Sequence, residues 1–356
     1  MKLKFAIVIL TILAIIAIPL LFSHQLYSYF DLPKTIALYI FAAGLFLLYT
    51  ISNRHTPNSG WLGKYISLYF IWLLFMALVS PNLSLAFFGG YSRYEGFFFF
   101  VASGFFFFIG NMLKEYKKQL ILAVLVTGAV VGALAVWEFW DGFWSSFQRS
   151  SSTFGNPMIL GTYFVLIIPA CFGYLFTTGN RWGKLVGFLS LFLLVLGTIF
   201  SFSRGGWGGL LITAVLFGYF GGKQFWINRK TMIVTALICI CAIGTGILMI
   251  RYQPKQVTLK NPQRLQSMVS QPTTDPAREA IYCATWQVFL EHPFTGVGLN
   301  GLATTITKHL SAAMVRSIPV NMNFDLAHND LLHTMATQGI PGLLIYLGLL
   351  FWLAKT

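Results

Sequence analysis

Apolar residues form long, nearly uninterrupted runs along this chain, and short polar segments separate them. A helix rises about 1.5 Å per residue, so about 20 apolar residues are needed to cross about 30 Å of hydrocarbon. Ten segments come near that length: Phe5–Phe22, Ile36–Ile51, Leu62–Val79, Phe97–Asn111, Leu120–Phe139, Met158–Thr178, Leu185–Phe202, Trp207–Tyr219, Met232–Ile250 and Ile340–Leu353. The pattern predicts an all-α, polytopic integral membrane protein with about ten transmembrane helices.

The composition excludes the soluble classes of protein. Of the 356 residues, 56% are apolar and only 10% are charged, and the mean hydropathy is +0.72. A soluble domain carries about 25% charged residues, so this chain could not build a wettable exterior. Soluble enzymes, secreted disulfide scaffolds and disordered chains are excluded together. The four cysteines contain no CxxC pair, which indicates neither a disulfide framework nor a zinc site.

The net charge of +14 indicates membrane topology rather than nucleic-acid binding. With a cytoplasmic N-terminus, twelve cations fall on the inner side: Lys2, Lys4, Arg54, Lys64, Lys114, Lys117, Lys118, Arg181, Lys184, Lys223, Arg229 and Lys230. Four fall in short outer loops: Lys34, Arg93, Arg149 and Arg204. Basic residues collect in cytoplasmic loops of membrane proteins. We therefore expect a multi-pass protein of the cytoplasmic membrane whose partner is the lipid bilayer and not a nucleic acid.

One segment, Arg251–Gly339, is too polar to span and is predicted to be an extracytoplasmic loop with short helices. Long loops of this kind usually carry function. Asp275 and Pro276 suit a helix start, and that helix would run to about His292. A second helix is predicted over Ala327–Gln338, with Gly339 as its stop and Pro341 opening the last span. We thus divide the chain into residues 1–250 with nine spans, a catalytic loop over 251–339, and a last span over 340–356.

Arg204 is the most conspicuous charged residue in an apolar context. It interrupts a nearly continuous apolar stretch within Ser201-Phe202-Ser203-Arg204-Gly205-Gly206. An ionisable group at such a depth is a candidate for a functional site, whereas an arginine that snorkels to the outer headgroups would give the same pattern. The residue pattern alone leaves both interpretations open.

His328 is a candidate proton acceptor. It falls in the first turn of the predicted Ala327–Gln338 helix, where the positive helix end disfavours imidazolium and favours a nearby phosphate oxygen. His333 lies five residues further, on another face of the helix, and could pair with Asp330. Packing or solvation explains His333 sufficiently, and for His328 alone a structural role competes with a functional one.

Two other chemistries lack support in the sequence. Gly296-Val297-Gly298-Leu299-Asn300-Gly301 satisfies G-x-G-x-x-G, but it follows a predicted helix and Pro293, so no βαβ unit surrounds it and no dinucleotide site is indicated. Neither D-x-D nor H-E-x-x-H occurs. We therefore expect no metal and no cofactor, and any oxyanion would have to be stabilised by arginine.

Several motifs resemble those of the O-antigen ligase / polymerase superfamily of membrane glycosyltransferases. They are Arg93-Tyr94-Glu95-Gly96, Phe154-Gly155-Asn156-Pro157, Ser203-Arg204-Gly205-Gly206, Pro293-Phe294-Thr295-Gly296-Val297-Gly298, and His328-Asn329 followed after nine residues by Gly339-x-x-Gly342. The last fits the ligase-type pattern H-[NSQ]-x9-G-x-x-[GTV] without a gap. Related proteins usually have further spans after the large loop, so the last span is expected to be truncated here.

The resemblance implies transfer of a glycan from undecaprenyl pyrophosphate to an acceptor hydroxyl at the outer face of the membrane. It implies Arg204 and Arg278 as donor-binding and catalytic arginines, His328 as the base, and Asn329 and Arg93 as further substrate-binding residues. Arg251, Arg264 and Arg316 compete with Arg278 for its role. Direct displacement would make the enzyme inverting, and arginines in the place of a metal would make it independent of metal. Arg204 and His328 are expected to serve one site.

Other functions stay open at this point. Members that act as ligases, chain polymerases or protein O-oligosaccharyltransferases share these motifs, so the acceptor could be a lipid core, a polysaccharide or a protein. A polysaccharide transporter or flippase would be a non-enzyme, but it predicts internal repeats that the sequence lacks. A structural scaffold for cell-envelope synthesis would not need the His328–Gly342 pattern.

Overall fold

The computed structural model describes residues 2–52, 60–91, 93–141, 149–227, 229–251, 276–311, 315 and 326–355. Contacts divide the chain into two compact units. Unit 1 comprises residues 1–37 and 115–271, and unit 2 comprises residues 38–114 and 272–356. The division falls within helix α2 (Asp31–Ile51) and within the short helix η1 (Lys114–Tyr116). The described residues contain helices and no strand, which confirms the predicted all-α class.

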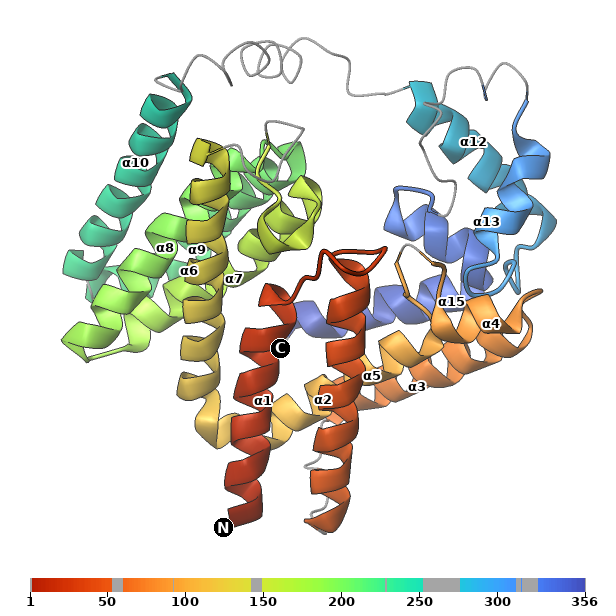
Figure 1. The fold of residues 1–356 in the computed structure, drawn as a ribbon, viewed down its shortest axis with the longest axis horizontal. Coiled ribbons are helices and arrows are strands. Elements are labelled where there is room, and N and C mark those ends of the chain that lie inside the picture. Colours follow the sequence, from red (N-terminus) through yellow and green to blue (C-terminus); the bar gives the residue numbers. More distant parts are fainter. Residues whose placement is uncertain are drawn as a thin grey trace. The chain divides into compact units, whose positions relative to one another are not determined.

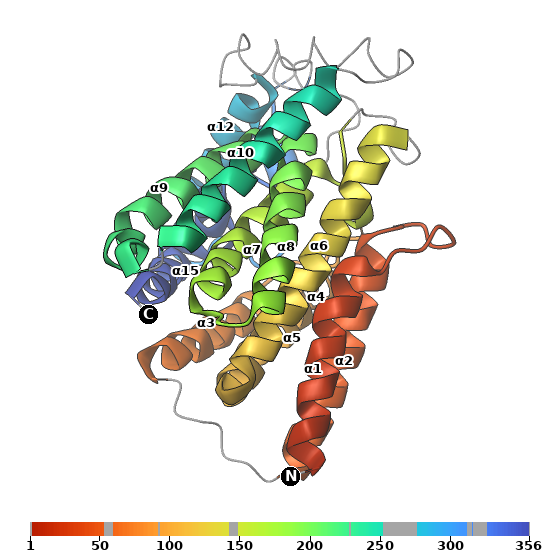
Figure 2. The same ribbon diagram turned by 90° about the vertical axis from the view of Figure 1, so that its left-hand side faces the viewer.

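Unit 1 is a bundle of long helices. Its elements are α1 (Lys2–Leu20), α6 (Lys117–Asp141), η2 (Ser152–Phe154), α7 (Pro157–Thr177), α8 (Arg181–Phe200), α9 (Arg204–Ile227) and α10 (Arg229–Arg251). Helix α8 packs between α6 and α10 and also contacts α7 and α9 (Figure 2).

The core of unit 1 follows from this central position of α8. In the most apolar stretch of α8, 56% of the residues are buried, whereas only 17% of the residues in the corresponding stretch of α10 are buried. Gly132 of α6 lies so close to α8 that a Cβ there would come within 2.7 Å of the Leu193 carbonyl oxygen. Small residues let membrane helices approach in this way. Phe139 and Phe200 stack with ring centroids 4.1 Å apart at the end of the same contact.

Unit 2 combines long apolar helices with several short elements. Its elements besides the later part of α2 are α3 (Gly60–Leu78), α4 (Leu83–Phe88), α5 (Phe97–Met112), α12 (Pro276–Glu291), α13 (Leu302–Thr305), η3 (Ile306–His309) and α15 (Asp330–Lys355). Helix α15 packs on α3 and on α12 (Figure 1). A buried apolar cluster of α12, α13, η3 and the start of α15 holds the short elements together.

All ten predicted apolar segments are helical. Within the described residues, eight helices are long and apolar enough to cross a membrane: α1, α2, α3, η1 with α6, α7, α8, α10 and α15. Helix α5 is apolar but has only 16 residues, and the side chains of α9 after residue 216 lie outside the described part. The chain is therefore a polytopic membrane protein.

The predicted outer helices need one correction. Helix α12 covers Pro276–Glu291 as expected, and the predicted cap Asp275 lies outside the described residues. The second predicted helix, Ala327–Gln338, is wrong at its start, because α15 begins at Asp330. The predicted stop at Gly339 is confirmed, because the helix breaks there and the last span follows to Lys355 beyond the kink. Gly339 itself is non-helical, with φ 67° and ψ −173°.

Candidate functional site

In unit 1, the turn between α8 and α9 presents Arg204. The Ser203 side chain caps α9, since its Oγ accepts a hydrogen bond from the Gly206 amide at 3.2 Å. Phe202, just before it, is buried and adopts a left-handed φ of 45°. Arg204 is the first residue of α9 and its side chain is exposed. A guanidinium is thus held at the positive end of a helix, where an anion is favoured.

A second arginine is attached to the same turn. Arg149 donates a hydrogen bond from Nε to the Ser201 carbonyl oxygen at 3.0 Å, and the next amide, that of Ser150, donates to the Phe200 carbonyl at 3.0 Å. The buried carboxylate of Glu138 accepts hydrogen bonds from the Ser151 amide at 2.8 Å and hydroxyl at 3.1 Å. These contacts fix the loop, so Arg149 and Arg204 flank one turn.

The Phe154-Gly155-Asn156-Pro157 motif belongs to this assembly. The Asn156 side chain caps α7 by accepting a hydrogen bond from the Met158 amide at 2.9 Å, and Pro157 is the first helical residue. One turn further, Gly161 lies against Ser203, where a Cβ would meet the serine Cβ at 3.1 Å. The helix that this motif opens therefore packs on Ser203 of the second motif in unit 1.

In unit 2, the segment from Pro293 to Gly301 locks onto the kink of α15. Three backbone hydrogen bonds join them: Val297 N to Ala336 O at 2.9 Å, Gly298 N to Thr337 O at 3.0 Å, and Ile340 N to Pro293 O at 2.8 Å. A Cβ on Gly296 would lie 2.3 Å from the Thr337 carbonyl carbon, and one on Gly339 would lie 2.3 Å from the Phe294 carbonyl oxygen. The glycines of the G-x-G-x-x-G sequence thus serve close backbone packing.

His328 lies just before α15 rather than in its first turn, which corrects the sequence prediction. It is half-buried and adopts a left-handed φ of 53°. The helix is capped by Asn329, whose Oδ1 accepts a hydrogen bond from the Leu332 amide at 3.2 Å. The Asn329 carbonyl also accepts one from the His333 amide at 2.8 Å. The polar residue of the motif therefore positions the helix end beside the histidine.

Helix α12 connects Arg278 to this histidine. The Tyr282 hydroxyl donates a hydrogen bond to the His328 carbonyl oxygen at 3.3 Å. Arg278 is exposed and lies one helical turn before Tyr282, hence on the same face of α12. Arg278 therefore lies on the face of α12 from which Tyr282 bonds to the His328 backbone.

Arg93 belongs to the same unit through Asn300. The Asn300 amide donates from Nδ2 to the carbonyl oxygens of Leu85 and Glu95, both at 3.1 Å. This ties the loop that carries half-buried Arg93 to the segment locked onto α15.

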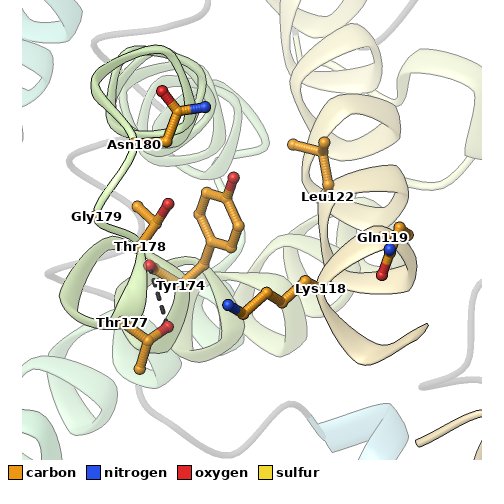
Figure 3. A pocket seen from close by; sticks show the side chains of 8 residues that line it. All are labelled: Lys118, Gln119, Leu122, Tyr174, Thr177, Thr178, Gly179 and Asn180. Atoms are coloured by element: carbon orange, nitrogen blue, oxygen red, sulfur yellow. Dashed lines mark hydrogen bonds between the residues drawn. The ribbon is translucent and has the colours of Figure 1, made fainter. Parts of the chain in front are cut away.

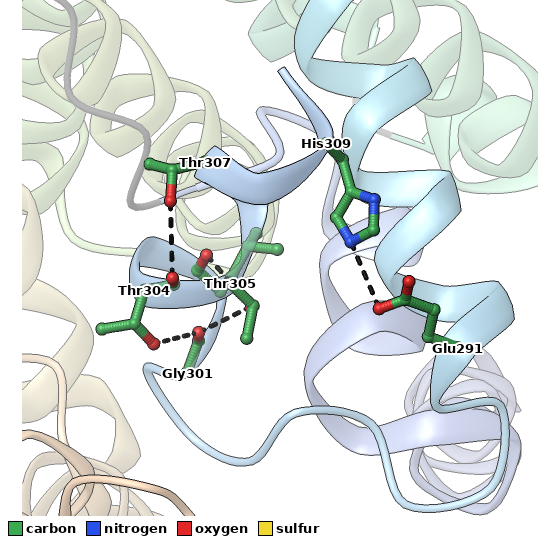
Figure 4. Close-up of polar contacts among 7 residues, drawn as sticks. Glu291, Gly301, Thr304, Thr305, Thr307 and His309 are labelled. Atoms are coloured by element: carbon green, nitrogen blue, oxygen red, sulfur yellow. Dashed lines mark hydrogen bonds and ion pairs between the residues drawn. The ribbon is translucent and has the colours of Figure 1, made fainter. Parts of the chain in front are cut away.

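A separate polar pair fastens η3 to α12. His309 Nε2 lies 3.2 Å from Glu291 Oε2, while the Thr304 and Thr305 hydroxyls donate to the Gly301 carbonyl at 2.8 and 2.9 Å (Figure 4). These contacts hold the two short helices in place beside α12.

The predicted site residues therefore fall into two local groups. Arg204 belongs to unit 1, and Arg93, Arg278, His328 and Asn329 belong to unit 2. Of the arginines that compete with Arg278, Arg264 and Arg316 lie outside the described residues, as does the side chain of Arg251. Within the described ranges, no group of three His, Cys, Asp or Glu side chains could hold a metal ion.

Three residues in these groups did not stand out in the sequence. Arg149 counted only as an outer-loop cation, and Tyr282 and Asn300 had no assigned role. Closeness to a motif could have indicated Arg149, which lies five residues before Phe154-Gly155-Asn156-Pro157.

The described helices define a polytopic helical membrane protein with motif residues gathered in each of its two units. Residues 189–347 match the model of a family described as O-antigen ligase, which supports membership of the O-antigen ligase superfamily. It is also 26% identical over 254 residues to an uncharacterized protein of Haemophilus influenzae (strain ATCC 51907 / DSM 11121 / KW20 / Rd). That match covers 67% of this chain and 60% of the relative.

Proposed function

We propose that this protein is a glycosyltransferase that moves a glycan from undecaprenyl pyrophosphate to an acceptor hydroxyl at the outer face of the cytoplasmic membrane. The observation that carries the proposal is the assembly in unit 2, where α12, which carries Arg278, bonds to the His328 backbone through Tyr282, and the Pro293–Gly301 segment locks onto the kink of α15. The match of residues 189–347 to a family described as O-antigen ligase supports the same reaction class.

The donor's pyrophosphate is the natural ligand for the arginines. Negative charge grows on the leaving pyrophosphate as the glycosidic bond breaks, and preorganised donors lower the barrier when they meet that charge. Guanidinium groups present forked donors that match phosphate oxygens. We assign this role to Arg204 and Arg278, with Arg149 as a further contact on the turn of Arg204 and Arg93 as a binding residue of unit 2.

His328 would accept the proton of the attacking hydroxyl. The acceptor oxygen forms a bond to the anomeric carbon, the bond from that carbon to the pyrophosphate oxygen breaks, and the imidazole takes the proton. Undecaprenyl pyrophosphate leaves with the bonding electrons, so one displacement inverts the anomeric configuration. The role of Asn329 in this scheme is to fix the backbone next to the base through its cap on α15.

Replacing His328 with alanine tests the base. Loss of a general base should lower transfer by about 10²- to 10⁴-fold. The assay uses purified full-length protein, a purified lipid-linked donor and the release of undecaprenyl pyrophosphate, which a transporter would not produce. The matched control is His333→Ala, because His333 is a histidine of the same region that lies five residues further along, in α15, and has no role in the proposed site. Asp330→Asn is a second control at the start of the same helix.

The two control variants should be much milder than His328→Ala. If His328→Ala turns over at nearly the wild-type rate while its level in the membrane is unchanged, the base assignment is wrong. The helix start would then have at most a donor-binding role.

A further inference from the structure

A cavity of about 360 Å³ opens in unit 1 where α6 begins and where α7 gives way to α8. Lys118 and Gln119 face it from α6, and Tyr174, Thr178 and Asn180 face it from the end of α7 and the turn that follows (Figure 3). Sites for small molecules begin at about 300 Å³, so the cavity has room for a headgroup-sized ligand. Leu122, one turn further into α6 than Lys118, supplies an apolar wall.

The polar lining of this cavity offers several hydrogen-bond donors. The Lys118 ammonium can only donate, the Gln119 and Asn180 amides and the Tyr174 and Thr178 hydroxyls can both donate and accept, and the Thr177 hydroxyl already donates to the Gly173 carbonyl at 2.8 Å. The Asn180 oxygen is engaged, because it caps α8 by accepting from the Trp182 amide at 3.1 Å, which leaves its amino group to face a ligand. In the part of the chain that the structure describes, no acidic side chain lines the cavity. Donors without acceptor partners fit an anion.

The surrounding charge is strongly positive. Lys114, Lys117 and Arg181 flank the cavity in sequence, and the one acidic residue in the segments 113–119 and 177–184, Glu115, pairs with Lys4. The start of α8 adds the partial positive charge of a helix N-terminus. An anion at Lys118 would therefore meet attraction from two chain segments.

The cavity also lies at the depth of lipid headgroups. It is formed where three candidate spans begin or end: Lys114–Trp140, Pro157–Thr177 and Arg181–Phe200. Trp182 is 63% exposed beside it, and exposed tryptophan at a span end is typical of the membrane–water boundary. Basic pockets between helices at this boundary bind anionic lipid headgroups.

We propose that this cavity binds the phosphate of an anionic phospholipid, with Lys118 and Tyr174 as the direct ligands. The shared chemistry is a phosphate ester. The lipid is favoured over a free phosphate ion because α6 runs on from Leu122 as an apolar candidate span, along which acyl chains can follow.

Native mass spectrometry of the purified full chain, offered equal amounts of phosphatidylglycerol and phosphatidylcholine, tests the proposal. Phosphatidylglycerol should bind preferentially to the wild type. Lys118→Ala should weaken its binding about tenfold, the loss expected for one charge-assisted hydrogen bond, and Tyr174→Phe about threefold. The matched control is Lys117→Ala, since Lys117 is exposed next to Lys118 and does not line the cavity.

Three outcomes would overturn the proposal. Equal losses in Lys117→Ala and Lys118→Ala would mean diffuse surface charge. Equal binding of the two lipids would mean that the cavity does not select a headgroup with net negative charge. Displacement of the lipid by inorganic phosphate or glycerol phosphate at matched concentration would mean a site for free anions. Tyr174→Phe keeps the packing of the ring, so it separates ligand loss from unfolding.

Discussion

At the scale of single residues, the turn between α8 and α9 holds two guanidinium groups in different ways. The hydrogen bond from Arg149 Nε to the Ser201 carbonyl fixes the orientation of one planar group. The Ser203 cap fixes only the backbone beneath Arg204, whose side chain is exposed. An exposed side chain that merely snorkelled could be exchanged for lysine, whereas a forked contact to pyrophosphate could not.

Arg204→Lys therefore distinguishes these two interpretations. The change keeps the charge and removes the fork, so we expect transfer to fall about tenfold or more, as for the loss of a charge-assisted hydrogen bond. Arg149→Lys should also lower transfer, and Arg181→Lys, at the start of α8, is the matched control with no expected loss. Transfer from the purified lipid-linked donor is the measurement. Near wild-type rates in Arg204→Lys would favour the snorkelling interpretation.

Single residues could be recognised from the sequence where a motif or an unusual context marked them. Arg204 interrupts an apolar stretch, and His328 opens a gapless pattern. Tyr282 could not be recognised, because its partner His328 is 46 positions away, and neither could Asn300, which bonds to Leu85 at a separation of 215 positions. Hydrogen bonds between segments so distant depend on tertiary packing, which local patterns do not encode.

At the scale of elements, α15 depends on one residue for its kink. Gly339 has φ 67°, a conformation that side chains with a Cβ rarely adopt, and it contacts the Phe294 carbonyl. Gly296, at φ 61°, makes the complementary approach to Thr337. The kink and the segment before α13 therefore hold each other, and both support the backbone that follows His328.

Alanine at either glycine should destabilise unit 2. A Cβ would lie 2.3 Å from backbone atoms in both cases, so the backbones must separate, and we expect a loss of about 2–4 kcal/mol of stability. Gly110→Ala in α5 is the matched control, because a Cβ there meets nothing within 4 Å and alanine favours helix. Thermal unfolding in detergent, monitored by size-exclusion chromatography of heated samples, should show lower unfolding midpoint temperatures for Gly339→Ala and Gly296→Ala than for the wild type. Midpoints as high as that of Gly110→Ala would contradict the locking role.

The sequence predicted the helices better than their ends. The ten segments predicted from apolar runs are all helical in the structure, because a segment that spans hydrocarbon must be long and carry little charge. The start of α15 was misplaced by three residues, since His328 adopts a left-handed conformation that places the cap at Asn329. The spacing of apolar residues does not reveal a left-handed backbone conformation, and a histidine gives no hint of one as a glycine would.

At the scale of the whole molecule, contacts group the chain differently from the division by membrane side. Unit 2 joins residues 38–114 with residues 272–356, so α3 packs on α15 although hundreds of positions separate them. Hydropathy gives each span a similar apolar surface, which leaves the choice of neighbours undetermined. The division into nine spans, an outer catalytic loop and a last span remains a prediction about sides of the membrane.

Independence of divalent metal is a property of the complete reaction. The sequence has no D-x-D pair, and the groups proposed to bind the donor are arginines. The negative charge on the leaving pyrophosphate should therefore be stabilised without a divalent metal ion. Transfer by purified full-length protein should therefore be the same in EDTA as in magnesium or manganese. A loss of activity in EDTA that either ion restores would disprove this mechanism.

The topology is the last prediction, and the proposed reaction depends on it. Twelve cations against four place the loops at Lys117 and Arg229 inside and the 251–339 segment outside. Cys283 is exposed on α12 and Ser311 is exposed after η3. In intact cells, a thiol reagent that does not cross the membrane should therefore label native Cys283, and Ser311→Cys in a Cys283→Ser background. Lys117→Cys in the same background should be labelled only after the membrane is opened, which also shows that this cysteine is reactive. Labelling in the reverse pattern would place Arg278 and His328 on the cytoplasmic side, and the transfer proposed for the outer face could not then occur.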